Sequence, residues 1–263
     1  MKFEVDGHEV FASTGSVHAA FEAPSIVFVH GAALDHTVWV MIARYFARKG
    51  FNVLALDLPG HGRSAGEPLQ SIDALSDWLH RVLQAREISQ ATFVGHSMGS
   101  LITYDFALRY PAKLKSLVLL GTAIPMPVSR VLLDASLTHL DVANRMANTF
   151  SHSSKTGPAA SPGSWNLGAG QRLMERATHG VLHADFTACN DFDPSVFKGR
   201  IVAPTLIVIG AEDQMTAPRR SLEVAEMIPQ AQTIRIPNCG HSMLSERPNQ
   251  VLDALAGFIP SFP

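Results

Sequence analysis

Three side chains that could carry out nucleophilic catalysis follow three separate apolar segments of the sequence. Ser97 lies at the centre of a Gly-x-Ser-x-Gly pattern. Asp213 follows the apolar run Ile207–Ile209, and His241 follows the run Gln232–Ile236. A serine hydroxyl is a weak nucleophile near neutral pH, so an imidazole must accept its proton and a carboxylate must orient that imidazole. We therefore predict that Ser97, Asp213 and His241 form a catalytic triad.

The surroundings of Ser97 are those that a nucleophilic serine needs. An apolar segment typical of a strand, Ala91–Val94, precedes it, and a segment of helical period, Met98–Arg109, follows. The chain must reverse sharply at Ser97, which strains its backbone and requires small flanking residues. The hydroxyl would then stand at the carboxyl end of a strand, beside a helix N-terminus that favours negative charge. The adjacent His96 is expected to pack beneath this turn rather than act as the base.

Two further groups complete the predicted chemistry. Glu212 is the alternative to Asp213 as the acid, since Asp213 could instead cap the helix that begins near Pro218. The backbone N–H groups of Ala32 and Met98 are the candidates for an oxyanion hole, because Ala32 follows an early apolar strand and Met98 follows the nucleophile.

A parallel sheet is the element that could bring these residues together. Short β-branched segments alternate with stretches of helical period, which indicates an α/β fold with helices on both faces of a mostly parallel sheet. The predicted strands are Ser25–Val29, Phe51–Leu56, Ala91–Val94, Lys115–Leu120, Thr205–Ile209 and Gln232–Ile236. The predicted helices are Val38–Arg48, Ile72–Leu83 behind Ser71 as N-cap, Met98–Arg109, Pro218–Met227 and Gln250–Phe258. Lys2–Phe11 is predicted to be a hairpin around Asp6-Gly7.

Residues 122–199 interrupt this alternation with two or three helical stretches and no convincing strand. We predict an α/β core formed by residues 1–121 and 200–263, with residues 122–199 inserted as a helical cap. Apolar cap residues are candidates for a substrate pocket, although at helical spacing they could equally form the cap's own core. The leading candidates are Met126, Met146, Trp165 and Leu182, followed by Leu132, Leu133, Phe150, Leu173 and Met174.

Composition narrows the range of partners. The sequence has 21 basic and 23 acidic residues, a formal charge of -2, and so lacks the basic surplus that nucleic acid requires. Acidic residues occupy the amino terminus where a secretory signal needs an apolar stretch, and no apolar run approaches the roughly 20 residues of a membrane span. We therefore expect a cytoplasmic protein with no membrane partner. Its two cysteines, Cys189 and Cys239, are expected to be reduced.

No metal site and no cofactor are predicted. His179 and His183 are the exception to a general lack of metal-ligand spacing, since they lie four residues apart on a possible helix. Surface or packed histidines are the expected interpretation.

Taken as an ordered set, these motifs resemble the α/β-hydrolase superfamily, in particular its compact capped bacterial carboxylesterases and enol-lactonases. The matching pieces are His30-Gly31 with Asp35 and Trp39, the stretch Asp57–Ser64, the Ser97 turn, Gly210–Asp213 with Pro218, and Gly240-His241 with Glu246-Arg247-Pro248. The resemblance implies a cofactor-free hydrolase with a catalytic triad.

The resemblance also ranks the possible activities. We expect a serine hydrolase that cleaves carboxylic esters of small to medium apolar acyl groups through an acyl-serine intermediate, with water as co-substrate. A lactonase, a thioesterase or a carbon–carbon bond hydrolase would use the same triad. A ligand-binding receptor with slow or no turnover is the alternative of another class. Ser97 stands where dehalogenases and epoxide hydrolases carry aspartate, and Ala32-Ala33 replaces a glycine-rich run found in many carbon–carbon hydrolases. The oligomeric state is not predicted.

Overall fold

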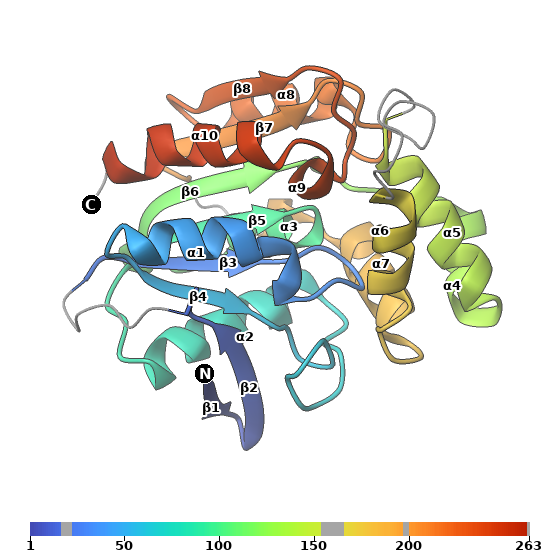
Figure 1. Ribbon diagram of the computed structural model, residues 1–263, viewed down its shortest axis with the longest axis horizontal. Helices are drawn as coiled ribbons and strands as arrows, with labels where there is room; N and C mark the ends of the chain where they lie inside the picture. Colours follow the sequence, from blue (N-terminus) through green and yellow to red (C-terminus); the bar gives the residue numbers. More distant parts are fainter. Residues whose placement is uncertain (17–22, 154–165, 197–199, 262–263) are drawn as a thin grey trace.

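The computed structural model describes residues 1–16, 23–153, 166–196 and 200–261 (Figure 1). Its strands form one sheet in the order β1-β2-β4-β3-β5-β6-β7-β8. The strands are β1 (Lys2–Val5), β2 (His8–Ser13), β3 (Ser25–Val29), β4 (Asn52–Leu56), β5 (Ala91–His96), β6 (Leu114–Leu120), β7 (Thr205–Gly210) and β8 (Gln232–Ile236). The α-helices are α1 (Val40–Arg48), α2 (Ile72–Ala85), α3 (Met98–Arg109), α4 (Arg130–Thr138), α5 (Leu140–Ser151), α6 (Asn166–Met174), α7 (Val181–Asp191), α8 (Pro218–Met227), α9 (Met243–Glu246) and α10 (Pro248–Phe258).

The sheet is mostly parallel, as the sequence predicts. Strands β3 to β8 pair in parallel, and only the β1–β2 hairpin joins the sheet in antiparallel pairing. Asp6 and Gly7 both have positive φ angles, 54° and 77°, which suits a two-residue hairpin turn. Strand β5 extends beyond the predicted Val94 to His96, because His96 still pairs with Leu120 of β6.

Side-chain alternation along the strands separates two cores, one on each face of the sheet. In β3, Val27 and Val29 pack in the core covered by α2, α3 and α8, whereas Ile26 and Phe28 pack in the core covered by α1 and α10. Figure 1 shows α1 and α10 in front of the sheet and α3 and α8 behind it. The helix predicted from Val38 begins instead with a 3₁₀ turn, because the Asp35 side chain accepts the Thr37 N–H there.

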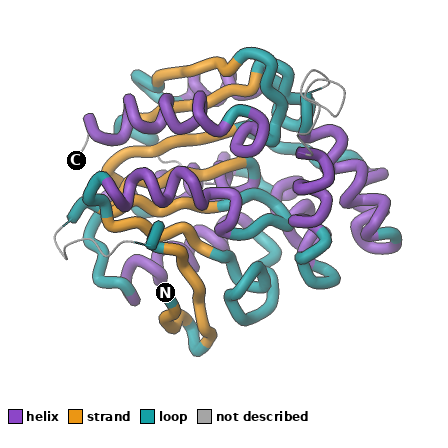
Figure 2. The backbone as a smooth tube through the Cα atoms, in the orientation of Figure 1, coloured by secondary structure: helices purple, strands orange, loops and turns teal. Residues whose placement is uncertain are grey.

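Helices α4 to α7 lie between β6 and β7 in the chain and gather beyond the carboxyl ends of the strands (Figures 1 and 2). They share a third, smaller core that includes Leu132, Leu182 and Phe186 and reaches Ala33 of the α/β part. The sequence predicts two or three helices here, but the described residues form four. Helices α4 and α5 are separated only by His139, whose φ of -143° and ψ of 66° are not helical.

Two further features concern the cysteines and the described helices. Cys189 and Cys239 are both buried free cysteines. Among the described helices, none is both long enough and apolar enough to cross a membrane.

We predict that Gly99 is required for α3 to pack against β3. A Cβ added at Gly99 would lie 2.3 Å from the Val29 carbonyl oxygen and 2.6 Å from that of His30. Gly99→Ala should therefore lower the free energy of unfolding in urea by about 1–3 kcal/mol, the range for overpacking of a rigid interior.

Gly257 in α10 is the matched control, since a Cβ added there would meet nothing within 4 Å. Gly257→Ala should raise the free energy of unfolding by about 0.5–1 kcal/mol, because alanine restricts the unfolded chain and favours the helix. Equal effects of the two substitutions would contradict the packing role of Gly99.

Candidate active site

The turn that carries Ser97 joins β5 to α3 in a strained conformation. Ser97 has φ 56° and ψ -122°, a region that L-residues rarely adopt and that costs about 1–3 kcal/mol. A Cβ on Gly95 would lie 2.1 Å from the Gly99 carbonyl oxygen, so the turn depends on these glycines. The Ser97 N–H donates to the Leu120 carbonyl at 2.9 Å, which ties the turn to β6.

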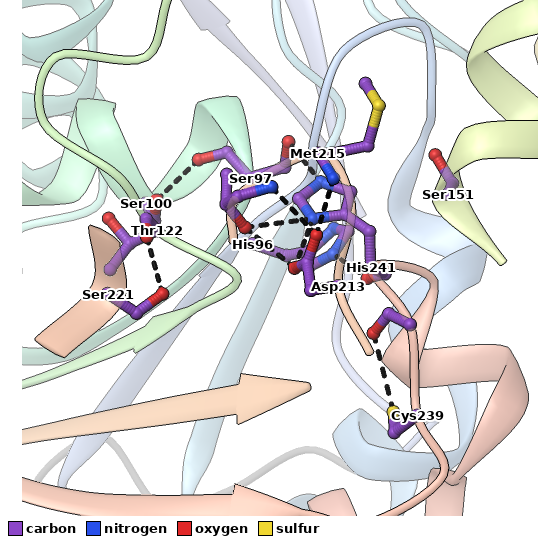
Figure 3. Close-up of polar contacts among 12 residues, drawn as sticks. His96, Ser97, Ser100, Thr122, Ser151, Asp213, Met215, Ser221, Cys239 and His241 are labelled. Atoms are coloured by element: carbon purple, nitrogen blue, oxygen red, sulfur yellow. Dashed lines mark hydrogen bonds and ion pairs between the residues drawn. The ribbon is translucent and has the colours of Figure 1, made fainter. Parts of the chain in front are cut away.

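The three predicted side chains form one line of hydrogen bonds (Figure 3). The Ser97 hydroxyl lies 2.8 Å from His241 Nε2, and His241 Nδ1 lies 2.8 Å from Asp213 Oδ2. They come from the loops after β5, β7 and β8, whose carboxyl ends lie at one edge of the sheet. His241 and Asp213 are only 5% and 4% exposed, so this line of hydrogen bonds is largely shielded from water.

Asp213 is held as an anion by its hydrogen-bond donors. Its Oδ1 accepts the N–H groups of Met215 and Thr216, each at 2.8 Å, and its Oδ2 accepts the Thr216 hydroxyl at 2.7 Å. Burial by itself would raise the pKa of Asp213, but the charge and hydrogen bonds of His241 and Thr216 bring it below its usual value. The carboxylate therefore accepts a hydrogen bond from His241 Nδ1–H, which leaves Nε2 unprotonated and able to accept a hydrogen bond from Ser97.

The two alternative residues have other contacts. Glu212 accepts a hydrogen bond from the Ser153 hydroxyl. His96 is buried beneath the turn, and its Nε2 lies 2.9 Å from the His241 carbonyl oxygen. Burial, together with the nearby His241, lowers the pKa of His96 to about 3. His96 is thus a neutral donor that supports the loop carrying His241.

The first of the two predicted oxyanion donors lies in a turn that approaches Ser97. A Cβ on Gly31 would be 3.0 Å from the Ser97 Cβ, and Ala32 and Ser97 line the same cavity. His30 Nδ1 donates to the Gly31 carbonyl at 2.8 Å. Since C=O and N–H point in opposite directions across a trans peptide, this bond contributes to the direction of the Ala32 N–H.

His30 is in turn held in one tautomer. Its Nε2 accepts the Leu58 N–H at 3.2 Å, so the ring proton is on Nδ1. Burial, reinforced by His61, lowers the pKa of His30 to about 4 and keeps the ring neutral. The second predicted donor, Met98, is the first residue of α3, where N–H groups lack intrahelical partners.

Two adjoining cavities meet at this site. The first, of about 80 Å³, is lined by Ser97, His241, Ala32, Met174, Phe186 and Met215, among others. The second, of about 280 Å³, shares Leu34, His96, Gly170 and Ser242 with the first and extends between α1, α6 and α9. Its lining is mainly apolar and includes Val38, Met41, Leu173 and Leu244. An apolar group bound at Ser97 could extend into this second cavity.

The leading pocket candidates from sequence occupy other positions. Met126 packs in the main core, Leu182 lies in the core of α4 to α7, and Met146 packs against that core. Within the described residues, the lining of the two cavities does not include them, whereas Met174 lines the first and Leu173 the second. Helical spacing identifies apolar positions but not which apolar surface each one meets. Trp165 lies outside the described residues.

The cavity residues that sequence reasoning missed have no local pattern. Leu34, Phe186 and Met215 reach the site from loops and helices far apart in the chain, so only the fold brings them together. Thr216 was missed as well, although its position three residues after Asp213 is one at which a backbone N–H commonly bonds an Asp side chain.

Histidines and acids elsewhere serve to brace the structure. In the part of the chain that the structure describes, Asp35, His36 and Asp57 form the one group with spacing suited to a cation. Asp57 Oδ1 accepts the N–H of His36 and lies 2.8 Å from its Nδ1, and Asp57 Oδ2 accepts the Arg63 N–H. These contacts join the loops after β3 and β4. His183 lies in α7 with its Nδ1 2.9 Å from the Ser136 hydroxyl, and His179 precedes that helix.

Comparison with known proteins agrees with this geometry. Residues 24–248 match the family model for the alpha/beta hydrolase fold. A pimeloyl-[acyl-carrier protein] methyl ester esterase of Chromobacterium violaceum is 28% identical over 244 residues, which cover 89% of this chain and 94% of that protein. A 2-hydroxy-6-oxononadienedioate/2-hydroxy-6-oxononatrienedioate hydrolase of Comamonas testosteroni is 27% identical over 241 residues, which cover 84% of this chain and 82% of that protein.

Solved structures share the architecture. An enol-lactonase from Burkholderia xenovorans superposes with a TM-score of 0.86 at 21% sequence identity, covering 99% of this chain and 100% of that chain. At this identity the likeness concerns the fold. With the family model matched over residues 24–248, the chain belongs to the α/β-hydrolase fold family and is a hydrolase.

Proposed function

We propose that this hydrolase cleaves carboxylic esters through an acyl-serine intermediate, with Ser97, His241 and Asp213 as its catalytic triad. The observation that carries the proposal is the continuous line of hydrogen bonds from Ser97 through His241 to Asp213, which opens on a cavity. The donors around Asp213 keep it charged, and Asp213 keeps Nε2 of His241 available as an acceptor. This is the arrangement that activates a serine hydroxyl.

The reaction follows from these contacts. Ser97 Oγ attacks the ester carbonyl carbon while His241 Nε2 takes the hydroxyl proton. The carbonyl oxygen becomes an oxyanion that accepts the N–H groups of Ala32 and Met98, at the positive end of α3. The carbon–oxygen bond to the alcohol then breaks, and His241 returns its proton to the leaving oxygen. Water repeats the sequence on the acyl-serine, releasing the acid and regenerating Ser97.

The cavities support an apolar substrate group. The smaller cavity admits the reacting carbonyl, and the adjoining 280 Å³ cavity has room for an apolar chain. The Chromobacterium relative is named for a methyl ester, whereas the Comamonas relative is named for ring-fission products. We propose ester cleavage rather than carbon–carbon bond cleavage because Ala32-Ala33 stands where many carbon–carbon hydrolases carry glycines.

We further propose that residues 122–199 act as a cap on a core of residues 1–121 and 200–263. Helices α4 to α7 share a core of their own and lie beyond the carboxyl ends of the strands. Residues of α5, α6 and α7, among them Ala147, Gly170 and Phe186, line the cavity beside Ser97. The cap would therefore select the substrate.

The triad is tested by substitution of each member. We expect Ser97→Ala to lower turnover of a good aryl ester by at least about a thousandfold, with His241→Ala nearly as damaging and Asp213→Asn somewhat less so. Glu212→Gln is the matched control and should stay close to wild type. The assay is a panel of esters of graded acyl length, lactones and thioesters, with folding checked by circular dichroism.

Other results would contradict the triad, the choice of acid or the substrate class. Near wild-type activity of Ser97→Ala would refute the mechanism, and a crippled Glu212→Gln beside a silent Asp213→Asn would move the acid to 212. Preference for lactones or thioesters would redirect the substrate class. Binding of esters by the wild-type protein without multiple turnover would favour a receptor.

Acidification is predicted to inactivate the protein through His241, because only a neutral imidazole can take the Ser97 proton. Three other buried histidines, His96, His30 and His61, keep their charge state from about pH 6.5 down to about pH 5. Burial lowers the pKa of His96 to about 3 and that of His30 to about 4, and His61, with its raised pKa, is already protonated there. We expect kcat/KM to fall about tenfold per pH unit in the range in which His241 is protonated. A flat profile from about pH 8 to about pH 5, with chemistry limiting, would contradict this role.

The larger cavity is predicted to hold the acyl chain. Leu173→Trp should fill it and lower kcat/KM for an octanoyl ester at least about tenfold relative to an acetyl ester, since each methylene in an apolar pocket is worth about 1–3 kcal/mol. Leu137→Trp is the matched control, because Leu137 lies in α4 and is 54% exposed. An unchanged octanoyl to acetyl ratio in Leu173→Trp would place the acyl chain elsewhere.

A further inference from the structure

Helix α7 places a buried carboxylate against the turn that carries the proposed oxyanion donor. Asp185 is 1% exposed, and its Oδ2 accepts the Ala33 N–H at 2.8 Å. The same oxygen lies 2.9 Å from Nε2 of His61, which is 2% exposed. The proposed reaction uses none of these groups. Burying a carboxylate and an imidazolium together costs desolvation free energy, so the pair calls for an explanation.

The contacts of His61 make Asp185 and His61 an ion pair. His61 Nδ1 lies 2.9 Å from the Pro59 carbonyl oxygen and Nε2 faces the Asp185 carboxylate, so both ring nitrogens meet acceptors. Burial lowers the pKa of His61, but the charge and hydrogen bond of Asp185, with help from Pro59 and Asp57, raise it overall. The neutral His30 ring lies on another side of His61. Asp185 is therefore a strong acceptor, fixed in direction.

The turn that receives this bond is strained. The Leu34 N–H donates to the Gly31 carbonyl at 3.2 Å, and Ala33, the third residue of this turn, has a φ of 54°. A positive φ at the third position is a feature of type II turns, in which glycine normally occupies that position. Rotation of the Ala32–Ala33 peptide to a type I turn would relieve Ala33 and reverse the direction of its N–H. The hydrogen bond to Asp185 opposes that rotation.

We propose that Asp185, paired with His61, is a positioning residue. By opposing rotation of the Ala32–Ala33 peptide, it keeps the adjoining Gly31–Ala32 peptide, which carries the Ala32 N–H, in position toward the oxyanion. This inference rests on the proposed function, because the oxyanion that the Ala32 N–H would bind forms only in the proposed reaction at Ser97. It makes the oxyanion site depend on α7, which also packs into the main core through Ala188 and Cys189.

A purely structural role would predict a different outcome. If Asp185 only anchors α7 to the core, its loss would loosen the cavity walls and raise KM, whatever residue occupies position 33. If Asp185 holds the turn, its loss would lower kcat, and a glycine at position 33 would compensate because glycine adopts a positive φ without strain. The two roles therefore differ in a double-mutant cycle.

The cycle combines Asp185→Ala with Ala33→Gly. We expect Asp185→Ala to lower kcat about tenfold to a hundredfold with KM within about threefold, since loss of a whole oxyanion donor costs about 100- to 1000-fold. Ala33→Gly alone should stay within about threefold of wild type, and the double variant should regain at least about tenfold in kcat. Asp191→Ala, at the exposed end of the same helix, is the control for effects on α7 and should match wild type.

Labelling of Ser97 by a fluorophosphonate gives a second measurement that needs no substrate. An unlabelled wild-type protein would refute the proposed function. A labelled wild type with an equal labelling rate and kcat in Asp185→Ala would overturn the present inference alone, as would an equal effect of Ala33→Gly in both backgrounds. Should Asp185→Ala not fold, Asp185→Asn, which keeps an oxygen acceptor without the charge, enters the same cycle. Its expected loss of kcat is smaller, and rescue by Ala33→Gly again supports the inference, whereas an unchanged kcat again overturns it.

Discussion

The reversal of the chain at Ser97 is the constraint on which the rest of the site depends. A serine at φ 56° is unfavourable in isolation, so the surrounding structure must hold it there. Gly95 and Gly99 let strand, turn and helix approach more closely than any side chain would permit. The same approach sets the N-terminus of α3 beside the hydroxyl. Packing on both faces of the sheet offsets the free energy that the strained turn costs.

Buried histidines around this turn differ in charge because their partners differ. His30 and His96 each face a carbonyl with one nitrogen and are held neutral by burial. His61 faces acceptors with both nitrogens and is held protonated by Asp185. His241 has a carboxylate on one side and a hydroxyl on the other, which leaves one nitrogen to exchange a proton. Chemistry can therefore be confined to one imidazole among several.

The helices between β6 and β7 contact both the cavity beside Ser97 and the turn that contains Ala33. Their small core supplies one wall of the cavity beside Ser97, while Asp185 of α7 reaches the turn opposite. In our proposals the same helices both choose the substrate and steady the oxyanion donor. The second role was not expected from the sequence, which indicates only candidates for a substrate pocket in residues 122–199.

The sequence by itself determined the strands, the sheet class and the order of the three chemical groups, because these depend on local hydrophobic period and on glycine spacing around Ser97. The predicted bounds of strands and helices are close to the observed ones in the core, where hydrophobic periodicity and burial coincide. The pocket was not determined this way: Met126 and Leu182 are apolar at helical spacing but pack in cores, whereas Leu34 and Met215 line the cavity. The Asp185 contact with Ala33 joins residues 152 positions apart. Only the tertiary structure decides such contacts, since which surface a side chain meets depends on how distant elements pack.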